Sequence, residues 1–203
     1  MKMHSLLSVR PTAAAWAAGV AVMALTGCAT APAPESSQRE LVVAVTAAHE
    51  LITFNAGQPS QILERRPVTG LPAGERLVGI DFRVARGVLY ALSQAGRLYT
   101  LDIPTGALRA VGAAPSVVAL RGTAFGFDFN PAADRIRVVS NTGQNLRLHP
   151  DTGAAVDGDA ALEGVQPDPS LRYAWSDAHA GRTPDVVAAA YTDNTQDSKL
   201  TTN

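Results

Sequence analysis

The chain has 203 residues and a formal net charge of −1 at pH 7, from 17 basic and 18 acidic side chains. This balance provides no electrostatic footprint for nucleic acid or an anionic membrane surface, so we expect no nucleic-acid partner. The single cysteine, Cys28, excludes an intramolecular disulfide.

The N-terminus has the pattern of a targeting segment. Lys2 and Arg10 supply the positive charge, and an apolar stretch follows over 13–25. That stretch is shorter than the roughly 20 residues of a membrane span. It ends in Leu-Thr-Gly-Cys at 25–28, which resembles the bacterial lipobox, the motif whose cysteine is lipidated and becomes the first mature residue.

This resemblance implies a lipoprotein signal peptide over 1–27 and a membrane contact through a lipid on Cys28. The small, polar and proline-bearing residues that follow predict a flexible tether over 28–40. Ala29, where a retained lipoprotein would have Asp, resembles outer-membrane sorting, with the domain facing the periplasm or the surface. The alternative is an ordinary signal peptide in which Cys28 has no role.

Two stretches, 78–106 and 125–153, repeat one another at an offset of 47 residues without a gap. A repeat of this length indicates stacked copies of one supersecondary unit. The positions that recur include these pairs: Gly79 and Gly126, Asp81 and Asp128, Phe82 and Phe129, Ser93 and Ser140, Gly96 and Gly143, Gly106 and Gly153.

Each copy contains short runs of period two, separated by turn residues such as proline, asparagine and glycine. In the second copy the pattern predicts strands over 124–129, 135–140, 145–149 and 154–156. In the first copy it predicts strands over 78–83, 88–93, 97–102 and 107–112. Four antiparallel strands per 40–50 residues is typical of a β-propeller blade, so we expect an all-β, propeller-like array.

The same offset extends the array in both directions over a domain of 41–203. Residues 42–45 align with 89–92, so the domain begins at the second strand of a unit. At the other end, 171–175 and 186–192 are predicted as a first and a second strand. The units are approximately 41–70, 78–112, 123–158 and 171–203. Residues 28–203 then correspond to about 3.7 blades, where propellers have about 4 to 8. We therefore expect an incomplete ring from a C-terminally truncated version of a longer propeller.

From about residue 41 onward the chain resembles the bacterial DUF4394 family, a domain of unknown function. This resemblance implies an exported, propeller-type β protein, and it assigns no catalytic residue. The motifs that carry it are Leu-Val-Gly-Ile-Asp-Phe-Arg at 77–83, Leu-Tyr-Ala-Leu at 89–92, Gly-Arg-Leu-Tyr at 96–99 and the run 126–147.

Asp81 and Asp128 occupy the same position in successive units. Recurring acids could line a channel and bind a cation through oxygen ligands. An aspartate at the end of an inner strand could instead accept hydrogen bonds from the backbone of the following turn. Recurrence from one unit to the next favours the structural interpretation.

A second group of polar residues is confined to one unit. The matching positions of the three arginines one copy earlier are uncharged, so the scaffold does not require their charge. They form the best candidate for a patch that binds a carboxylate or phosphate, the alternative being a solvated strand face. The candidates are Arg135, Arg137, Arg147, Asn141 and Asn145.

No motif for catalysis or cofactor binding is present, and His49, His149 and His179 lack metal-ligand spacing. We therefore expect no cofactor and a binding or scaffold role rather than an enzyme. The partner would be an envelope protein or a small ligand. The alternative is a metal-dependent hydrolase of the lactonase type, with Asp81 and Asp128 as weak metal-ligand candidates.

Overall fold

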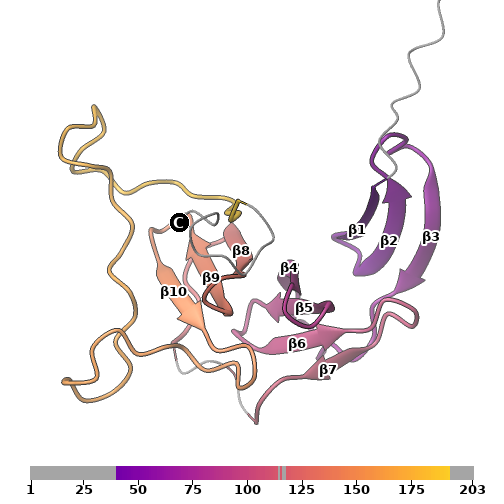
Figure 1. Cartoon of the computed structure of the whole chain (residues 1–203), viewed down its shortest axis with the longest axis horizontal. Helices are drawn as coiled ribbons and strands as arrows, with labels where there is room; N and C mark the ends of the chain where they lie inside the picture. Colours follow the sequence, from indigo (N-terminus) through magenta and orange to yellow (C-terminus); the bar gives the residue numbers. More distant parts are fainter. Residues whose placement is uncertain (1–39, 114, 116–117, 193–203) are drawn as a thin grey trace, which may run out of the picture. The chain divides into compact units, whose positions relative to one another are not determined.

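Ten β-strands in three antiparallel sheets make up the part of the chain that the structure describes, which is residues 40–113, 115 and 118–192 of a computed structural model (Figure 1). These residues contain no helix. The all-β class expected from the sequence is therefore confirmed. The targeting segment, Cys28 and residues 193–203 lie outside the described residues.

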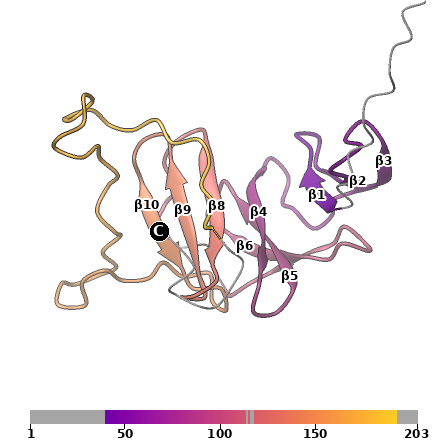
Figure 2. The same cartoon turned by 45° about the horizontal axis from the view of Figure 1, so that its top comes forward.

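Within each sheet the strands follow one another in chain order, as Figure 2 shows for the third sheet. The first sheet has β1 (Leu41–Val45), β2 (Glu50–Asn55) and β3 (Ile62–Pro67). The second has β4 (Leu77–Arg83), β5 (Val88–Ser93), β6 (Leu98–Leu101) and β7 (Leu108–Ala110). The third has β8 (Phe125–Asn130), β9 (Arg135–Ser140) and β10 (Asn145–Leu148).

Strand register confirms the 47-residue repeat. The same cross-strand pair occurs in all three sheets: Val43 with Thr53, Tyr90 with Thr100, and Arg137 with Arg147. β1 is thus the counterpart of β5 and β9, as the alignment predicted. The fourth strand expected over 154–156 is reduced to a single bridge between Leu148 and Ala155.

Glycine sets the hairpins between the middle strands of the second and third sheets. Gly96 and Gly143 have φ of 78° and 76°, values at which a side chain would be strained. Each donates its N–H to the serine carbonyl three residues earlier, Ser93 or Ser140. The sequence predicted both turns because glycine is the residue that tolerates this conformation.

The second sheet is buried on both of its faces. Leu89 and Ala91 of β5 belong to a cluster with Leu51 of the first sheet, whereas Tyr90 and Leu92 belong to a cluster with the third sheet. Side chains alternate along a strand, so consecutive residues of β5 serve different clusters. Because burial of a leucine contributes about 1.5–3 kcal/mol, each sheet stabilises its neighbour.

The end of the described chain differs from the prediction. Neither 171–175 nor 186–192 forms a strand, and residues 157–192 carry no regular element. The described sheets form no closed ring. No helix among the described residues is long and apolar enough to cross a membrane.

Candidate functional site

Asp81 and Asp128 connect successive units. The Oδ2 atom of Asp81 on β4 accepts a hydrogen bond of 2.8 Å from the backbone N–H of Phe129 on β8. The Oδ2 atom of Asp128 accepts one of 2.6 Å from the N–H of Tyr191. The donor lies in the next unit along the chain, not in the turn that follows the aspartate. The structural interpretation predicted backbone N–H donors, and the structure has them, but they belong to the next unit and not to the following turn.

The two carboxyls also lie close to one another. Burial, and then the charge of Asp81 and a hydrogen bond with it, raise the pKa of Asp128 to about 6, against the opposing effect of the Tyr191 N–H. A carboxyl with this pKa holds a proton in mildly acidic solution, and a shared proton removes the repulsion between the pair. The pair is thus a contact between inner strands that depends on protonation.

Arg83 at the end of β4 is a second connection between units. Its side chain is 3% exposed and contacts two carboxylates of the third unit. Nε and Nη2 donate to the oxygens of Asp134 at 2.8 and 2.5 Å, and Nη1 donates to Asp151 at 2.5 Å. These hydrogen bonds hold the pKa of both carboxyls below their usual range. Arg83 was not among the residues predicted from the sequence; the available signal was a charged residue at the end of a predicted strand.

Three of the five polar candidates converge around one acid. Nη1 of Arg137 donates to Asp168 at 2.5 Å and to Asn145 at 2.7 Å. Arg147 binds the same carboxylate through Nε at 2.9 Å and Nη2 at 2.7 Å. Burial opposes ionisation of Asp168, but the two guanidinium groups hold its pKa below the usual value. Asp168 follows β10 in a segment without repeats, so the sequence did not reveal this partner.

The other two candidates are used elsewhere. Asn141 accepts a hydrogen bond of 3.0 Å from the N–H of Thr123 and orders the chain before β8. Arg135 donates through Nη1 to the carbonyl of Asp134 at 2.9 Å. The structure therefore divides the predicted patch into an Arg137–Arg147–Asn145 cluster around Asp168 and two separate local contacts.

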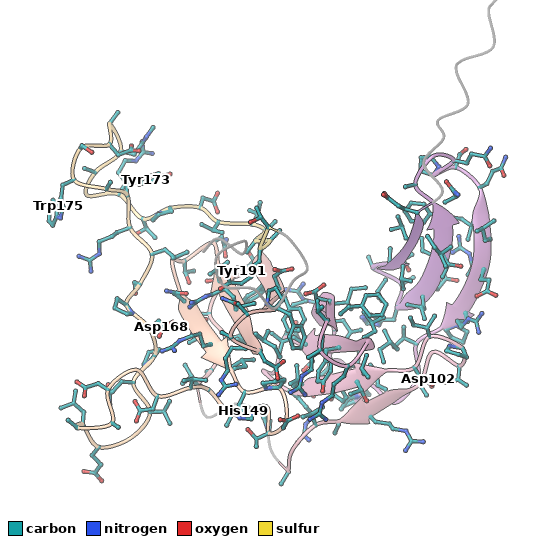
Figure 3. All side chains as sticks on the ribbon, viewed as in Figure 1. Asp102, His149, Asp168, Tyr173, Trp175 and Tyr191 are labelled. Carbon is teal, nitrogen blue, oxygen red and sulfur yellow. The ribbon has the colours of Figure 1, made fainter. Side chains whose placement is uncertain are left out.

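A cavity of about 250 Å³ lies beyond Asp168, in the segment 170–183. Trp175, at the outer bend of this segment, is 90% exposed (Figure 3). The ring of Tyr173 stacks at a tilt on His179, with 5.2 Å between the ring centroids. Arg172 and Arg182 form no ion pair with any described residue. The lining includes Leu171, Arg172, Tyr173, Trp175, Arg182 and Thr183.

The described residues contain no group of three or more His, Cys, Asp or Glu side chains placed to hold a metal ion. The histidines lie apart from one another. His49 lines a cavity beside β4, the ring of His149 accepts the N–H of Asp151 at 3.2 Å, and His179 pairs with Asp177. Arranged in this way, these groups serve turns and packing.

Comparison with known proteins identifies the chain by family. A search of curated proteins finds no match. The model of a family described as a domain of unknown function, DUF4394, matches residues 50–203, which is more than half of the chain. The resemblance predicted from the repeat motifs is thus confirmed, and the chain belongs to the DUF4394 family.

Proposed function

We propose that this protein is a binding module of the bacterial cell envelope, built from β-propeller-type units and held to a membrane by a lipid on Cys28. Three sheets with one register and a 47-residue spacing support the propeller architecture. The lipobox and the tether that follows it support the anchor.

The observation that carries the binding role is the group of three exposed side chains, Trp175, Arg172 and Arg182, beside the half-buried Tyr173. Trp, Tyr and Arg are the residue types enriched at the energetic centres of protein interfaces. The neighbouring cavity, at about 250 Å³, is below the ~300–1,000 Å³ of typical small-molecule sites. A protein partner is therefore favoured over a small ligand, and the two guanidinium groups, which pair with no carboxylate in the described part of the chain, favour an acidic one.

In this proposal Arg137 and Arg147 position the binding segment and do not contact the partner. Both bind Asp168, two residues before the cavity lining begins at Ser170. The amide of Asn145 adds a hydrogen bond of 3.1 Å to the carbonyl of Pro169. These contacts fix one end of segment 170–183 to the third sheet.

We prefer this function to the hydrolase alternative because of how Asp81 and Asp128 are used. One oxygen of each carboxylate already accepts a backbone N–H from the next unit. Both side chains thereby join neighbouring units, a role for which recurrence from one unit to the next is expected.

Photo-crosslinking in cells tests the binding role. A photoreactive amino acid at position 175 is expected to give a discrete adduct with an envelope protein. Replacing Arg172 and Arg182 by Glu is expected to abolish the adduct, because the charge offered to an acidic partner is reversed. The same probe at Ala160, an exposed position outside the cavity, is the matched control. Identical adducts from positions 175 and 160 would contradict the proposal.

A further inference from the structure

The first sheet has an open edge at β1. Thr46 donates its N–H to the carbonyl of Glu50 on β2. Residues of an antiparallel pair alternate in direction, so Val42 and Ala44 also form backbone hydrogen bonds with β2. Val43 and Val45 direct their N–H and C=O groups away from β2. In the other two sheets the counterparts of β1 are covered on this side, because β4 pairs with β5 and β8 pairs with β9. Among the described residues no strand covers β1 on this side.

β4 and β8, the first strands of the second and third sheets, each pack against the next unit by the same kind of contact. Between β4 and β8, Asp81 accepts the N–H of Phe129, and a Cβ at Gly79 would lie 2.3 Å from that of Phe127. Between β8 and the last described residues, Asp128 accepts the N–H of Tyr191, and a Cβ at Gly126 would lie 2.5 Å from the backbone nitrogen of Ala189. In both contacts a glycine lies against the next unit, and an aspartate two residues later accepts a backbone N–H from that unit.

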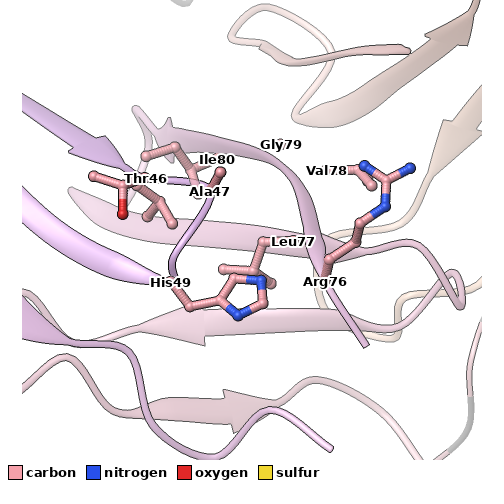
Figure 4. Close-up of a pocket in the computed structure, with 9 residues that line it drawn as sticks. Thr46, Ala47, His49, Arg76, Leu77, Val78, Gly79 and Ile80 are labelled. Atoms are coloured by element: carbon pink, nitrogen blue, oxygen red, sulfur yellow. The ribbon is translucent and has the colours of Figure 1, made fainter. Parts of the chain in front are cut away.

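β4 also contains the residues that would accept such a contact from a preceding unit. Ile80 and Phe82 are the counterparts of Phe127 and Phe129, 47 positions earlier. Phe129 is 2% exposed, whereas Phe82 is 39% exposed. Beside them, a cavity of about 310 Å³ lies between the end of β1 and the first residues of β4 (Figure 4). Val45, Thr46, His49, Leu77 and Ile80 contribute to its lining.

We propose that the edge of β1, together with Ile80 and Phe82, is a docking groove for an extended Gly-x-Asp-apolar strand supplied by a separate polypeptide. The strand pairs antiparallel with β1, as β4 pairs with β5. Its glycine lies against Ile80 and its aspartate accepts the N–H of Phe82. This is strand addition to an exposed sheet edge, with main-chain bonds for affinity and the aspartate for specificity.

A labelled peptide with the sequence of residues 123–131, Thr-Ala-Phe-Gly-Phe-Asp-Phe-Asn-Pro, is the probe. Fluorescence anisotropy with the full-length chain is expected to show saturable binding. Asparagine in place of the peptide's aspartate should weaken binding about tenfold or more, because a charge-assisted hydrogen bond is replaced by a neutral one. A scrambled peptide is the negative control.

Two variants of the chain test the groove itself. Val43→Pro removes an outward N–H without removing a bond to β2, and it should weaken peptide binding at least about tenfold. Val43→Ala keeps the N–H and should bind normally. Phe82→Glu places a negative charge beside the incoming aspartate on an exposed side chain, so it should weaken binding in a chain that remains folded by circular dichroism.

Four results would overturn the proposal. One is equal binding of the aspartate and asparagine peptides, and another is full binding by Val43→Pro. The third is a dimer, seen in analytical ultracentrifugation and abolished by Val43→Pro, because a second copy would then occupy the groove. The fourth is peptide binding that requires deletion of 193–203, because a segment of the same chain would then be the occupant.

Discussion

Arg83 joins two turns of the third unit to the end of β4 with one guanidinium group. Asp134 receives two of its N–H groups and Asp151 a third, while the Tyr90 hydroxyl lies 3.4 Å from Nη1. The planar fork of arginine offers donors in several fixed directions, which the single ammonium of lysine does not. The connection therefore depends on the residue type as well as on its charge.

Arg83→Met should lower the free energy of unfolding by about 2 kcal/mol, because it removes the charge-assisted hydrogen bonds to Asp134 and Asp151, two carboxylates that water still reaches. Urea unfolding followed by circular dichroism measures the change. Arg86→Met is the matched control. Its side chain is 60% exposed and 3.7 Å from Asp151, so the expected change is under about 0.5 kcal/mol. Equal effects of the two substitutions would show that Arg83 does not join the units.

Asp128 should make stability depend on pH between about 4 and 6. Its pKa is raised to about 6 in the folded protein, so folding favours the protonated carboxyl. Its contribution is thus largest below the unfolded pKa of about 4 and is lost as pH rises through about 6. The shift in pKa corresponds to about 3 kcal/mol, which solvent screening of this half-buried carboxyl reduces to about 2 kcal/mol. The carboxyls with lowered pKa, such as Asp134 and Asp168, have the opposite effect: the stability they contribute is lost as pH falls below about 4.

Asp128→Asn should remove this dependence, because the amide cannot titrate but its oxygen can still accept the Tyr191 N–H. The midpoint of thermal unfolding, measured from pH 4 to 7 for both proteins, isolates the effect. The expected result is a curve that falls toward pH 7 in the natural chain and falls less in the variant. Parallel curves would contradict the prediction.

At the scale of elements, the repeat explains why most strands were predictable and the segment after β10 was not. Period-two runs and turn glycines are local signals, and they placed β4 to β6 and β8 to β10 within about two residues. Residues 188–191 lie against β8 through Asp128 and Gly126, contacts that no local pattern encodes. Their apolar character predicted a strand, but among the described residues none pairs with them as a sheet.

The candidate site divides in the same way. Arg137 and Arg147 could be identified because each can be compared with the residue 47 positions earlier, which is uncharged. Asp168, Trp175 and Arg182 lie where no copy exists for comparison, and their proximity arises from the path of an irregular segment. Arg83 was missed for a different reason, since its partners are 51 and 68 residues away.

The segment after β10 should lose its attachment to the third sheet in Asp168→Asn. The amide keeps the size of the side chain but removes the charge that Arg137 and Arg147 share. Hydrogen exchange, read by mass spectrometry, should become faster in residues 157–185 and stay unchanged in β8 to β10. Glu163→Gln, on an exposed residue of the same segment, is the control and should change neither. Faster exchange throughout the sheet would mean that Asp168 stabilises the unit as a whole.

At the scale of the whole molecule, the proposed anchor and the folded units have separate tasks. The units depend on one another, since β5 contributes to a cluster on each of its faces. The proposed tether, 28–40, has the composition of a chain that buries no core, and such a chain could hold a folded domain away from a bilayer. The anchor should then determine where the protein is, and the folded units what it binds.

Cys28→Ala should separate these two tasks. Because it removes the chain's single thiol, incorporation of a radioactive fatty acid should be lost and the protein should move from the membrane fraction to the soluble fraction. Thermal unfolding of the units should be unchanged, since the substitution lies in the tether. Thr30→Ala, two residues further on, is the control and should keep both the label and the membrane fraction. Labelling that persists in Cys28→Ala would mean that the anchor is elsewhere, and an ordinary signal peptide would then account for the N-terminus.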